Sequence, residues 1–431
     1  MRVAVVALGK IGLPLAVQFA SRGHTVVGAD VDPSVVDLVQ QGMSPSPGEA
    51  DLSERLASVV RGGLLTATTD TAAAVAASEA VVVVVPLFVD ADGAPDFGWL
   101  DSATADIARG LQPGTLVSFE TTLPVGTTRG RFKPQLELGS GLAEGEDFHL
   151  VFSPERVLTG RVFADLRRYP KLIGGLSELG AKQAAAFYEA VLEFDVRPDL
   201  DRANGVWDLG SAEAAELAKL AETTYRDVNI GLANQFAVFA ASEGIDVYRV
   251  IEASNSQPYS HIHRPGIAVG GHCIPVYPQL YLWGDPGATV VRTARQANAA
   301  MPAYAVGLAR GAYGDLAGAR VVVLGAAYRG GVKETAFSGV FPTVDALQAE
   351  LAEVTVHDPM YSDDELRALG FEPHRLGTAV DVAILQADHV GYRDLASTDL
   401  PAVAVIVDGR AVLDPGRFPE AQVLVIGGGQ P

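Results

Sequence analysis

The chain has 431 residues, of which 48% are hydrophobic and 19% charged, and its formal net charge is −20. This length predicts two or three domains, and the apolar content argues against a disordered chain. So acidic a surface repels nucleic acid and anionic lipid, and no apolar run of about 18 residues is present, so we expect no nucleic-acid or membrane partner. A single cysteine excludes an intrachain disulfide and a cysteine-based zinc site, and we expect no metal and a cytoplasmic location.

The first 200 residues have the element order of a doubly wound parallel sheet. An apolar run at Val3–Leu8 ends at glycines, Leu13–Ser21 has helical spacing, and Thr25–Ala29 is a second apolar run. The consecutive valines Val81–Val85 are typical of a parallel strand that is buried on both faces. Further strands are predicted at Thr115–Phe119, His149–Phe152 and Lys171–Ile173.

A long helix is predicted over Ser211–Glu243. This segment has no proline and carries apolar residues at helical spacing, namely Leu217, Leu220, Tyr225, Val228, Leu232, Phe236 and Phe239. A helix of this length is unusual within a globular domain. We therefore expect it to join two domains and to offer a dimer contact.

Alternating strands and helices return after residue 300. Strands are predicted at Arg320–Leu324, Val354–Val356, Val382–Leu385, Val403–Val407 and Val423–Ile426. The predicted fold class is α/β, with two Rossmann-like doubly wound domains joined by a long central helix. The predicted divisions are residues 1–200, 201–300 and 301–431.

The turn after the first strand has the pattern of a dinucleotide site. Residues 7–12 read ALGKIG, which is GxGxxG with alanine at the first position, so Gly9, Lys10, Ile11 and Gly12 are candidate cofactor contacts. Asp30 ends the next strand, where a carboxylate accepts hydrogen bonds from a ribose diol and repels a 2′-phosphate. The pattern predicts NAD rather than NADP; the alternative is a tight turn that binds no ligand.

The only cysteine lies in a segment rich in glycine and proline, residues 264–278, which read RPGIAVGGHCIPVYP. Glycine or proline residues on both sides of Cys273 restrict the backbone around its thiol, which favours a role for Cys273 as an accessible nucleophile. Taken alone, a single cysteine is more often an inert buried residue, and His272 is more often structural than catalytic.

Six sequence blocks in this chain resemble those of the UDP-glucose/GDP-mannose dehydrogenase family, in the family's order. They are GKIGLPLA (9–16), ETTLPVGTT (120–128), SPERVLTG (153–160), KLAETTYRDVNIGLANQ (219–235), GGHCIPV (270–276) and GAAYRGGVKETAFSG (325–339). The histidine before the cysteine is typical of the branch that acts on UDP-N-acetylhexosamines.

The resemblance implies oxidation of C6 of a nucleotide sugar to a uronate, with two NAD consumed per sugar. It implies that Cys273 forms a thiohemiacetal and then a thioester, and that Lys219 stabilises negative charge on the sugar oxygen. Glu155 is implied as the general base of thioester hydrolysis, and Thr122 as the residue that positions the water. Further contacts implied by the resemblance are Pro86 and Thr122 for NAD, and Lys219, Arg264, Gly270, Gly271, His272, Tyr277 and Arg329 for the nucleotide sugar.

Three positions depart from the family's pattern. Thr223 replaces an asparagine in the catalytic group, Tyr277 replaces an aspartate, and Ala336 replaces an arginine that helps to hold NAD. The preferred substrates are UDP-N-acetylmannosamine and UDP-N-acetylglucosamine, followed by UDP-glucose. Two other readings stay open: a β-hydroxyacid dehydrogenase, which needs no cysteine loop, and a nucleotide-sugar-binding protein without turnover. A homodimer or higher homo-oligomer is expected.

Overall fold

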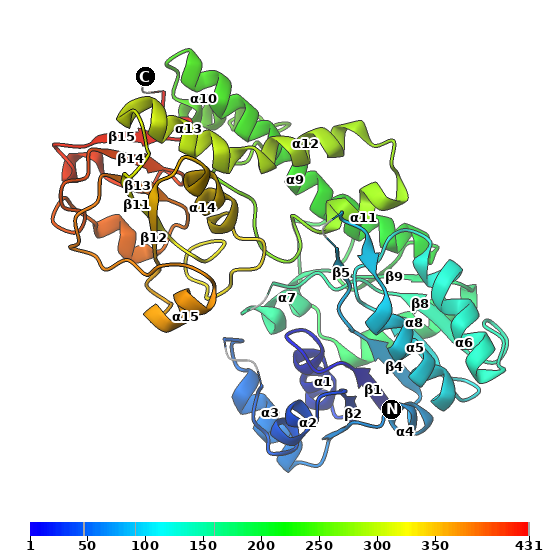
Figure 1. Cartoon of the computed structure of the whole chain (residues 1–431). Helices are drawn as coiled ribbons and strands as arrows, with labels where there is room; N and C mark the ends of the chain where they lie inside the picture. The colour runs from blue at the N-terminus through cyan, green and yellow to red at the C-terminus, as the bar shows by residue number, and fades with distance from the viewer. Residues whose placement is uncertain (46–47, 91, 159, 430–431) are drawn as a thin grey trace. The chain divides into compact units, whose positions relative to one another are not determined.

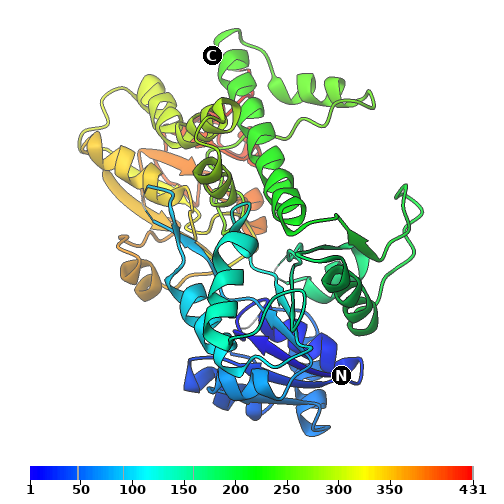
Figure 2. The ribbon, with the colours of Figure 1, turned by 90° about the vertical axis from the view of Figure 1, so that its right-hand side faces the viewer.

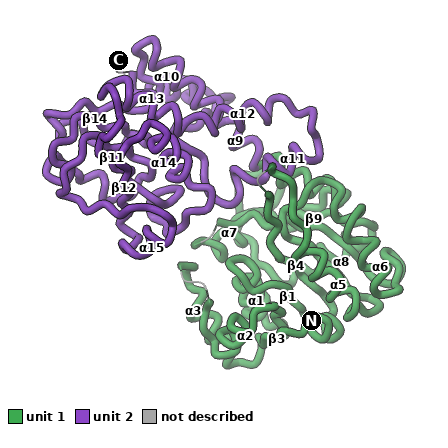
Figure 3. Tube along the Cα trace, in the orientation of Figure 1, with its two compact units in different colours: residues 1–222 green, residues 223–431 purple. Residues whose placement is uncertain are grey.

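The structure is a computed structural model that describes residues 1–45, 48–90, 92–158 and 160–429. The chain divides into two compact units, unit 1 at Met1–Glu222 and unit 2 at Thr223–Pro431 (Figure 3). Within the described residues, no helix is both long and apolar enough to cross a membrane.

Unit 1 is built on an eight-stranded sheet with the order β10-β9-β8-β7-β4-β1-β2-β3 (Figure 1). Neighbouring strands are parallel except β8 and β9, which are antiparallel. The strands are β1 (Arg2–Val6), β2 (Thr25–Ala29), β3 (Leu65–Thr68), β4 (Ala80–Val83), β7 (Leu116–Phe119), β8 (His149–Phe152), β9 (Lys171–Gly175) and β10 (Val206–Asp208).

Helices connect these strands, and a short hairpin, β5 (Phe88–Val89) and β6 (Pro95–Asp96), follows β4. The helices are α1 (Gly12–Ser21), α2 (Pro33–Gln40), α3 (Leu52–Arg61), α4 (Thr71–Ala76), α5 (Gly98–Gly110), the π-helix η1 (Thr128–Phe132), α6 (Lys133–Ser140), α7 (Val162–Arg168) and α8 (Glu178–Val191). Strand order reverses between β1 and β4, and at such a point the carboxyl ends of the strands leave a crevice for a ligand.

The long helix α9 (Ala212–Ser242) has 31 residues and is easily followed in both views (Figures 1 and 2). It begins and ends within one residue of the predicted bounds. Its residues up to Glu222 belong to unit 1 and the rest to unit 2. Gly231 lies where α9 packs closely on α12 (Thr289–Ala299), because a β-carbon there would lie 3.0 Å from the carbonyl oxygen of Ala294.

Unit 2 contains a five-stranded parallel sheet with the order β12-β11-β13-β14-β15. Its strands are β11 (Arg320–Leu324), β12 (Glu353–His357), β13 (Val382–Leu385), β14 (Val405–Asp408) and β15 (Gln422–Val425). Its helices are α10 (Val247–Asn255), α11 (Tyr277–Gly284), α13 (Met301–Tyr313), α14 (Val340–Ala349), α15 (Asp363–Ala368) and the 3-10 turns η2 (Val390–Asp394) and η3 (Pro415–Arg417).

Both faces of this second sheet are buried. Successive residues of β11 alternate between two hydrophobic clusters, with Val321 and Val323 in one and Val322 and Leu324 in the other. That arrangement explains why the strand reads as a continuous apolar run. Two Rossmann-like sheets and a long central helix confirm the predicted fold class.

Candidate active site

The glycine turn of unit 1 lies between β1 and α1, at the reversal of strand order. Ala7, at the motif's first glycine position, has a φ of 74°, a left-handed conformation that glycine adopts more readily. Gly12 cannot carry a side chain, because its β-carbon would lie 1.9 Å from the carbonyl oxygen of Ala7. Gly9 and Lys10 are exposed at the turn and Ile11 is half-buried.

Asp30 is fixed beside this turn. Its Oδ2 accepts a hydrogen bond from the Leu8 N–H at 2.7 Å, and its Oδ1 accepts one from the Asp32 N–H at 3.0 Å. Each carboxylate oxygen retains a second lone pair for a ribose hydroxyl. The close backbone approach at Gly12 and this carboxylate fit an adenine dinucleotide without a 2′-phosphate.

The segments after β4 and β7 meet at the same edge of the sheet. The Thr121 hydroxyl donates to the Val85 carbonyl at 2.6 Å, which places Pro86 and Thr122 on neighbouring loops. Pro86 is exposed, whereas Thr122 is buried.

Glu155 lies next to two lysines. Its backbone N–H donates to the Glu120 carbonyl at 3.1 Å, and its side chain accepts from the Val157 N–H. Burial raises the pKa of Glu155, and the positive charges of Lys219 and Lys171 act in the opposite direction. Glu155 and Lys219 are therefore close enough to interact electrostatically.

A small cavity of about 20 Å³ lies beside Glu155. Its charged or polar lining includes Glu120, Asp165 and Lys171. Such a volume suits a single water molecule with several polar partners.

The sequence did not predict the buried pair that borders this cavity. The Lys171 ammonium donates to Glu120 Oε2 at 2.5 Å, and the Tyr188 hydroxyl donates to Glu120 Oε1 at 2.7 Å. The Glu120 and Lys171 side chains are 0% and 6% exposed. A buried charge needs such a partner, but the partner lies 51 positions away and no local pattern indicates it.

In unit 2, Cys273 lies on the turn that leads into α11. Its carbonyl accepts the Val276 and Tyr277 N–H groups at 3.2 and 2.9 Å. The Cys273 side chain is half-buried, and Tyr277 is the first residue of α11.

The loop that precedes Cys273 packs on the segment after β11. Gly270 packs against Tyr328 and Phe337, and the Gly271 N–H donates to the Ala336 carbonyl at 2.8 Å. His272 Nε2 lies 3.3 Å from Glu334 Oε2. Ala336 therefore holds the cysteine loop through its backbone carbonyl, and this hydrogen bond does not depend on the side chain at position 336.

Two asparagines of α9 hold the earlier part of the same loop. Asn229 accepts from the His263 N–H at 3.0 Å and donates to the His261 carbonyl at 2.6 Å. Asn234 accepts from the Gly266 N–H at 2.9 Å. Arg264 lies between these two attachments and is exposed.

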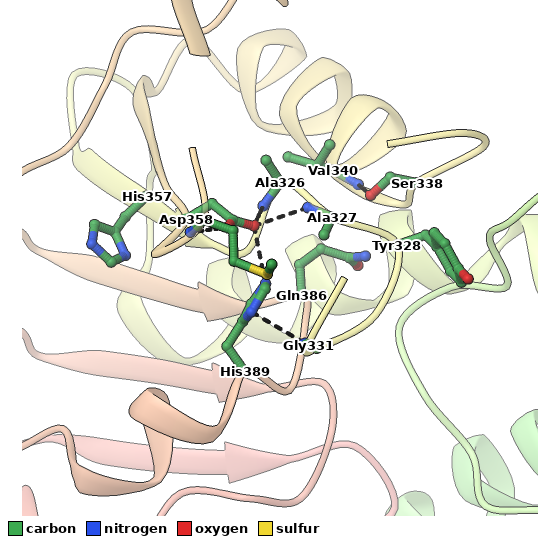
Figure 4. Close-up of polar contacts among 12 residues, drawn as sticks. Ala326, Ala327, Tyr328, Gly331, Ser338, Val340, His357, Asp358, Gln386 and His389 are labelled. Carbon is green, nitrogen blue, oxygen red and sulfur yellow. Dashed lines mark hydrogen bonds and ion pairs between the residues drawn. The ribbon is translucent and has the colours of Figure 1, made fainter. Parts of the chain in front are cut away.

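The loop over residues 325–331 lies at the carboxyl ends of β11, β12 and β13 (Figure 4). Asp358 Oδ2 accepts from the Ala326 and Ala327 N–H groups at 2.9 and 3.0 Å and lies 3.0 Å from His389 Nε2. The Gly331 N–H points to His389 Nδ1 at 3.4 Å. This buried network holds the loop to two strand ends.

Arg329 is carried on this loop and is exposed, with its Nε 3.3 Å from the Tyr328 hydroxyl. A second guanidinium, which sequence reasoning missed, follows β14. Arg410 donates to the Gln386 carbonyl at 2.7 Å and to the Tyr328 carbonyl at 3.4 Å, and burial lowers its pKa. The sequence signal for Arg410 was the run DGR at 408–410, which follows the apolar residues Val403–Val407.

The predicted residues therefore fall into two groups, one in each unit. Unit 1 brings together Thr122, Glu155 and Lys219 near the glycine turn, and unit 2 brings together the Cys273 loop, Tyr277 and Arg329. Thr223 is buried on α9, one turn after Lys219. Among the described residues, no cluster of three or more His, Cys, Asp or Glu side chains is arranged to hold a metal ion.

Three family models match consecutive parts of the chain. The NAD binding domain of the UDP-glucose/GDP-mannose dehydrogenase family matches residues 1–192, the central domain residues 213–300, and the UDP binding domain residues 322–415.

Individual relatives match over nearly the whole length. UDP-N-acetyl-D-mannosamine dehydrogenase of Pyrococcus horikoshii is 35% identical over 96% of each chain, and the enzyme of that name from Escherichia coli K12 is 30% identical over 95% of this chain and 98% of its own. The solved structure of UDP-D-ManNAc dehydrogenase from P. horikoshii superposes with a TM-score of 0.88 at 33% identity, covering 100% of both chains.

These matches confirm the resemblance, the NAD cofactor and the oxidoreductase class that the sequence predicted. The domain boundaries and the roles of individual residues stay predictions. The chain belongs to the UDP-glucose/GDP-mannose dehydrogenase family, the NAD-dependent dehydrogenases of nucleotide sugars.

Proposed function

We propose that this enzyme oxidises C6 of UDP-N-acetylmannosamine to the uronate. The observation that carries the proposal is the match over 95–96% of the chain to relatives named UDP-N-acetyl-D-mannosamine dehydrogenase. His272 supports it, because its position before the cysteine suits the N-acetylhexosamine branch and its ring lies 3.3 Å from Glu334.

The reaction proceeds in four balanced steps. The C6 alcohol loses a hydride and a proton to give an aldehyde, and the Cys273 thiol adds across its carbonyl to give a thiohemiacetal. Loss of a second hydride and proton gives a thioester, and water then cleaves the carbon–sulfur bond to release the carboxylate and restore the thiol. NAD, when bound at the glycine turn, accepts the hydride of each oxidation.

Lys219 supplies a positive charge where negative charge develops on the sugar oxygen. Glu155 accepts the proton of the attacking water, and Thr122 orients that water. The hydroxyl of Thr223 takes the place of the family's asparagine on α9. Tyr277, a neutral phenol at pH 7, lines the sugar pocket and does not replace the family's aspartate as a base.

The remaining proposed contacts divide between NAD, in unit 1, and the nucleotide sugar, in unit 2. Gly9, Lys10, Ile11, Gly12, Asp30 and Pro86 bind NAD. Arg264, Gly270, Gly271, His272 and Arg329 bind the nucleotide sugar, and arginine suits its phosphates because it donates two parallel hydrogen bonds.

The test is the ratio of NADH formed to sugar consumed across UDP-N-acetylmannosamine, UDP-N-acetylglucosamine, UDP-glucose and GDP-mannose. We expect two NADH per sugar and the highest kcat/KM with UDP-N-acetylmannosamine. One NADH with release of an aldehyde or ketone contradicts the mechanism, a higher kcat/KM with another sugar contradicts the substrate, and binding without NADH means a protein that has lost turnover.

We also propose that the enzyme is a cytoplasmic homodimer. NAD is available in the cytoplasm, and a nucleophilic thiol stays reduced there. The support for a dimer is the exposed apolar stripe on α9 that Tyr225, Leu232, Phe236 and Phe239 form, hereafter the α9 stripe. A second copy of the same helix is the partner that such a self-complementary face suits.

A further inference from the structure

Glu216 is a buried carboxylate that the proposed mechanism does not use. It lies on α9, three residues before Lys219, and residues at that spacing share one face of a helix. Its exposed fraction is 0%. A carboxylate this deeply buried costs free energy unless its oxygens accept hydrogen bonds.

Three hydrogen bonds link Glu216 to the loop that follows Thr122. Oε2 accepts from the Gly126 N–H at 2.5 Å. Oε1 accepts from both the N–H and the hydroxyl of Thr128, at 2.9 and 2.7 Å. One side chain of α9 thereby fixes two backbone positions of this loop.

Thr122 lies between two attachment points of the same segment. On one side, the Thr121 hydroxyl donates to the Val85 carbonyl at 2.6 Å. On the other, the Glu216 carboxylate holds Gly126 and Thr128. A turn between them is closed by the Thr127 hydroxyl, which donates to the Pro124 carbonyl at 2.7 Å.

We propose that Glu216 is a positioning residue, which ties the segment 121–128 to α9 and so fixes Thr122 relative to Lys219. This inference rests on the proposed roles of Thr122 and Lys219. Its consequence is for turnover rather than for affinity, because a small misplacement of a group that orients the reacting water lowers the rate of a chemical step.

The hydrogen bonds between Glu216 and the segment 121–128 depend on pH, because they depend on whether Glu216 is ionised. Burial raises the pKa of Glu216 to about 7, while its hydrogen bonds to Thr128 and Gly126 lower it and the negative charge of Glu213 raises it. Arg129 on η1 also lies at this contact and pairs with Glu213 at 2.6 Å, and the negative charges of Glu144 and Glu216 act on it as well. The three hydrogen bonds lower the pKa of Glu216, so breaking them while the side chain stays buried raises that pKa further. Protonation therefore favours the arrangement without these bonds, and the contact weakens as pH falls through about 7.

The experiment compares Glu216→Gln with Glu213→Gln in the full-length enzyme. The matched control changes a carboxylate one turn earlier on α9 whose ion pair with Arg129 is partly exposed. Amide hydrogen exchange of peptides covering residues 121–132 measures the tie directly and needs no substrate. Steady-state kinetics with UDP-N-acetylmannosamine and NAD from pH 6 to 9 measure its consequence.

We expect Glu216→Gln at pH 8 to exchange these amides faster and to lower kcat roughly tenfold, with KM for both substrates within about twofold. The wild-type exchange rates should approach those of the variant as pH falls through 7, after correction for intrinsic exchange. Glu213→Gln keeps the three Glu216 hydrogen bonds, so at pH 8 its kcat and the exchange of residues 121–128 should match the wild type. Its pH midpoint should be lower, because the negative charge of Glu213 raises the pKa of Glu216.

If Glu216→Gln fails to fold, Thr128→Val removes only the hydroxyl bond and is expected to change both readouts in the same direction. Unchanged exchange contradicts the tie, and faster exchange with unchanged kcat contradicts the positioning role. If the wild type forms no NADH with any sugar, the proposed function fails, while the exchange measurement still decides whether Glu216 holds the loop.

Discussion

At the scale of single residues, Glu155 is the proposed general base of thioester hydrolysis. Burial raises its pKa, and the neighbouring charges of Lys219 and Lys171 lower it. A general base must be ionised to accept a proton, so hydrolysis should decline at a higher pH than it would with an exposed glutamate. In the proposed mechanism, the attacking water lies in the water-sized cavity that Glu155 lines.

Replacing Glu155 with glutamine should separate oxidation from hydrolysis. Glutamine cannot accept the proton of water, so both oxidations should proceed once and the acyl-enzyme should accumulate. We expect a burst of about two NADH per active site, and intact-protein mass spectrometry should detect the UDP-uronyl group on Cys273. The surface variant Glu146→Gln should turn over normally, and normal turnover by Glu155→Gln would assign the base to another residue.

The residues in family blocks, such as Lys219 and Thr122, could be named from the sequence because the resemblance supplied their roles. Glu120 lies in such a block, but the resemblance gave it no role, and Glu216 and Lys171 lie outside the six blocks. Their importance arises from burial and from partners 88 and 51 positions away in sequence. A glutamate or lysine is ordinarily a solvated surface residue, and only packing distinguishes these three from such residues.

At the scale of elements, the apolar runs predicted most strands to within two residues, because parallel strands buried on both faces have a strong local signal. β4 ends at Val83 rather than Val85, and β1 ends at Val6 rather than Leu8, since the backbone there turns toward the ligand edge. β3 and β10 were not predicted, because they are edge strands of three or four residues with alternating or partial burial.

In the loop over residues 325–331, the sequence shows where the glycines are but not which backbone contacts require them. Its glycines were visible in the sequence, but the reason for Gly330 was not. A β-carbon there would lie 2.2 Å from the Asp388 carbonyl oxygen, so the loop packs directly on the backbone after β13. Asp358 and His389 hold the same loop from the strand ends (Figure 4).

Gly330→Ala should therefore displace Arg329 and weaken binding of the nucleotide sugar. We expect KM for the sugar, and Kd for UDP measured by calorimetry, to rise about tenfold, which corresponds to roughly 1.4 kcal/mol, with Kd for NAD unchanged. Gly391→Ala is the matched control, because a β-carbon at that position meets nothing within 4 Å. Equal Kd for UDP in the two variants would show that this loop does not hold the nucleotide.

At the scale of the whole molecule, net charge and the α9 stripe have opposite effects on the association of two copies of the chain. The net charge of −20 makes two copies repel at long range. The α9 stripe favours their association, because Tyr225, Leu232, Phe236 and Phe239 are 58%, 45%, 38% and 64% exposed on one face of the helix. The sequence predicted the helix and these apolar residues, but which of them are exposed became clear only from the packing around α9.

Phe236→Glu should convert the proposed dimer into a monomer, because it places a charge within the apolar stripe and adds to the repulsion between two acidic subunits. Light scattering coupled to gel filtration should give twice 45.0 kDa for the wild type and 45.0 kDa for the variant. Leu138→Glu makes the same change at a residue that is 89% exposed on α6 and is not part of the stripe, and it should leave the proposed dimer intact. Raising the ionic strength should tighten the wild-type dimer, because salt screens the repulsion between exposed charges over about 10 Å at 0.1 M. A Phe236→Glu variant that stays dimeric would move the interface away from α9, and a wild type that is monomeric at all salt concentrations would remove the dimer from the proposal.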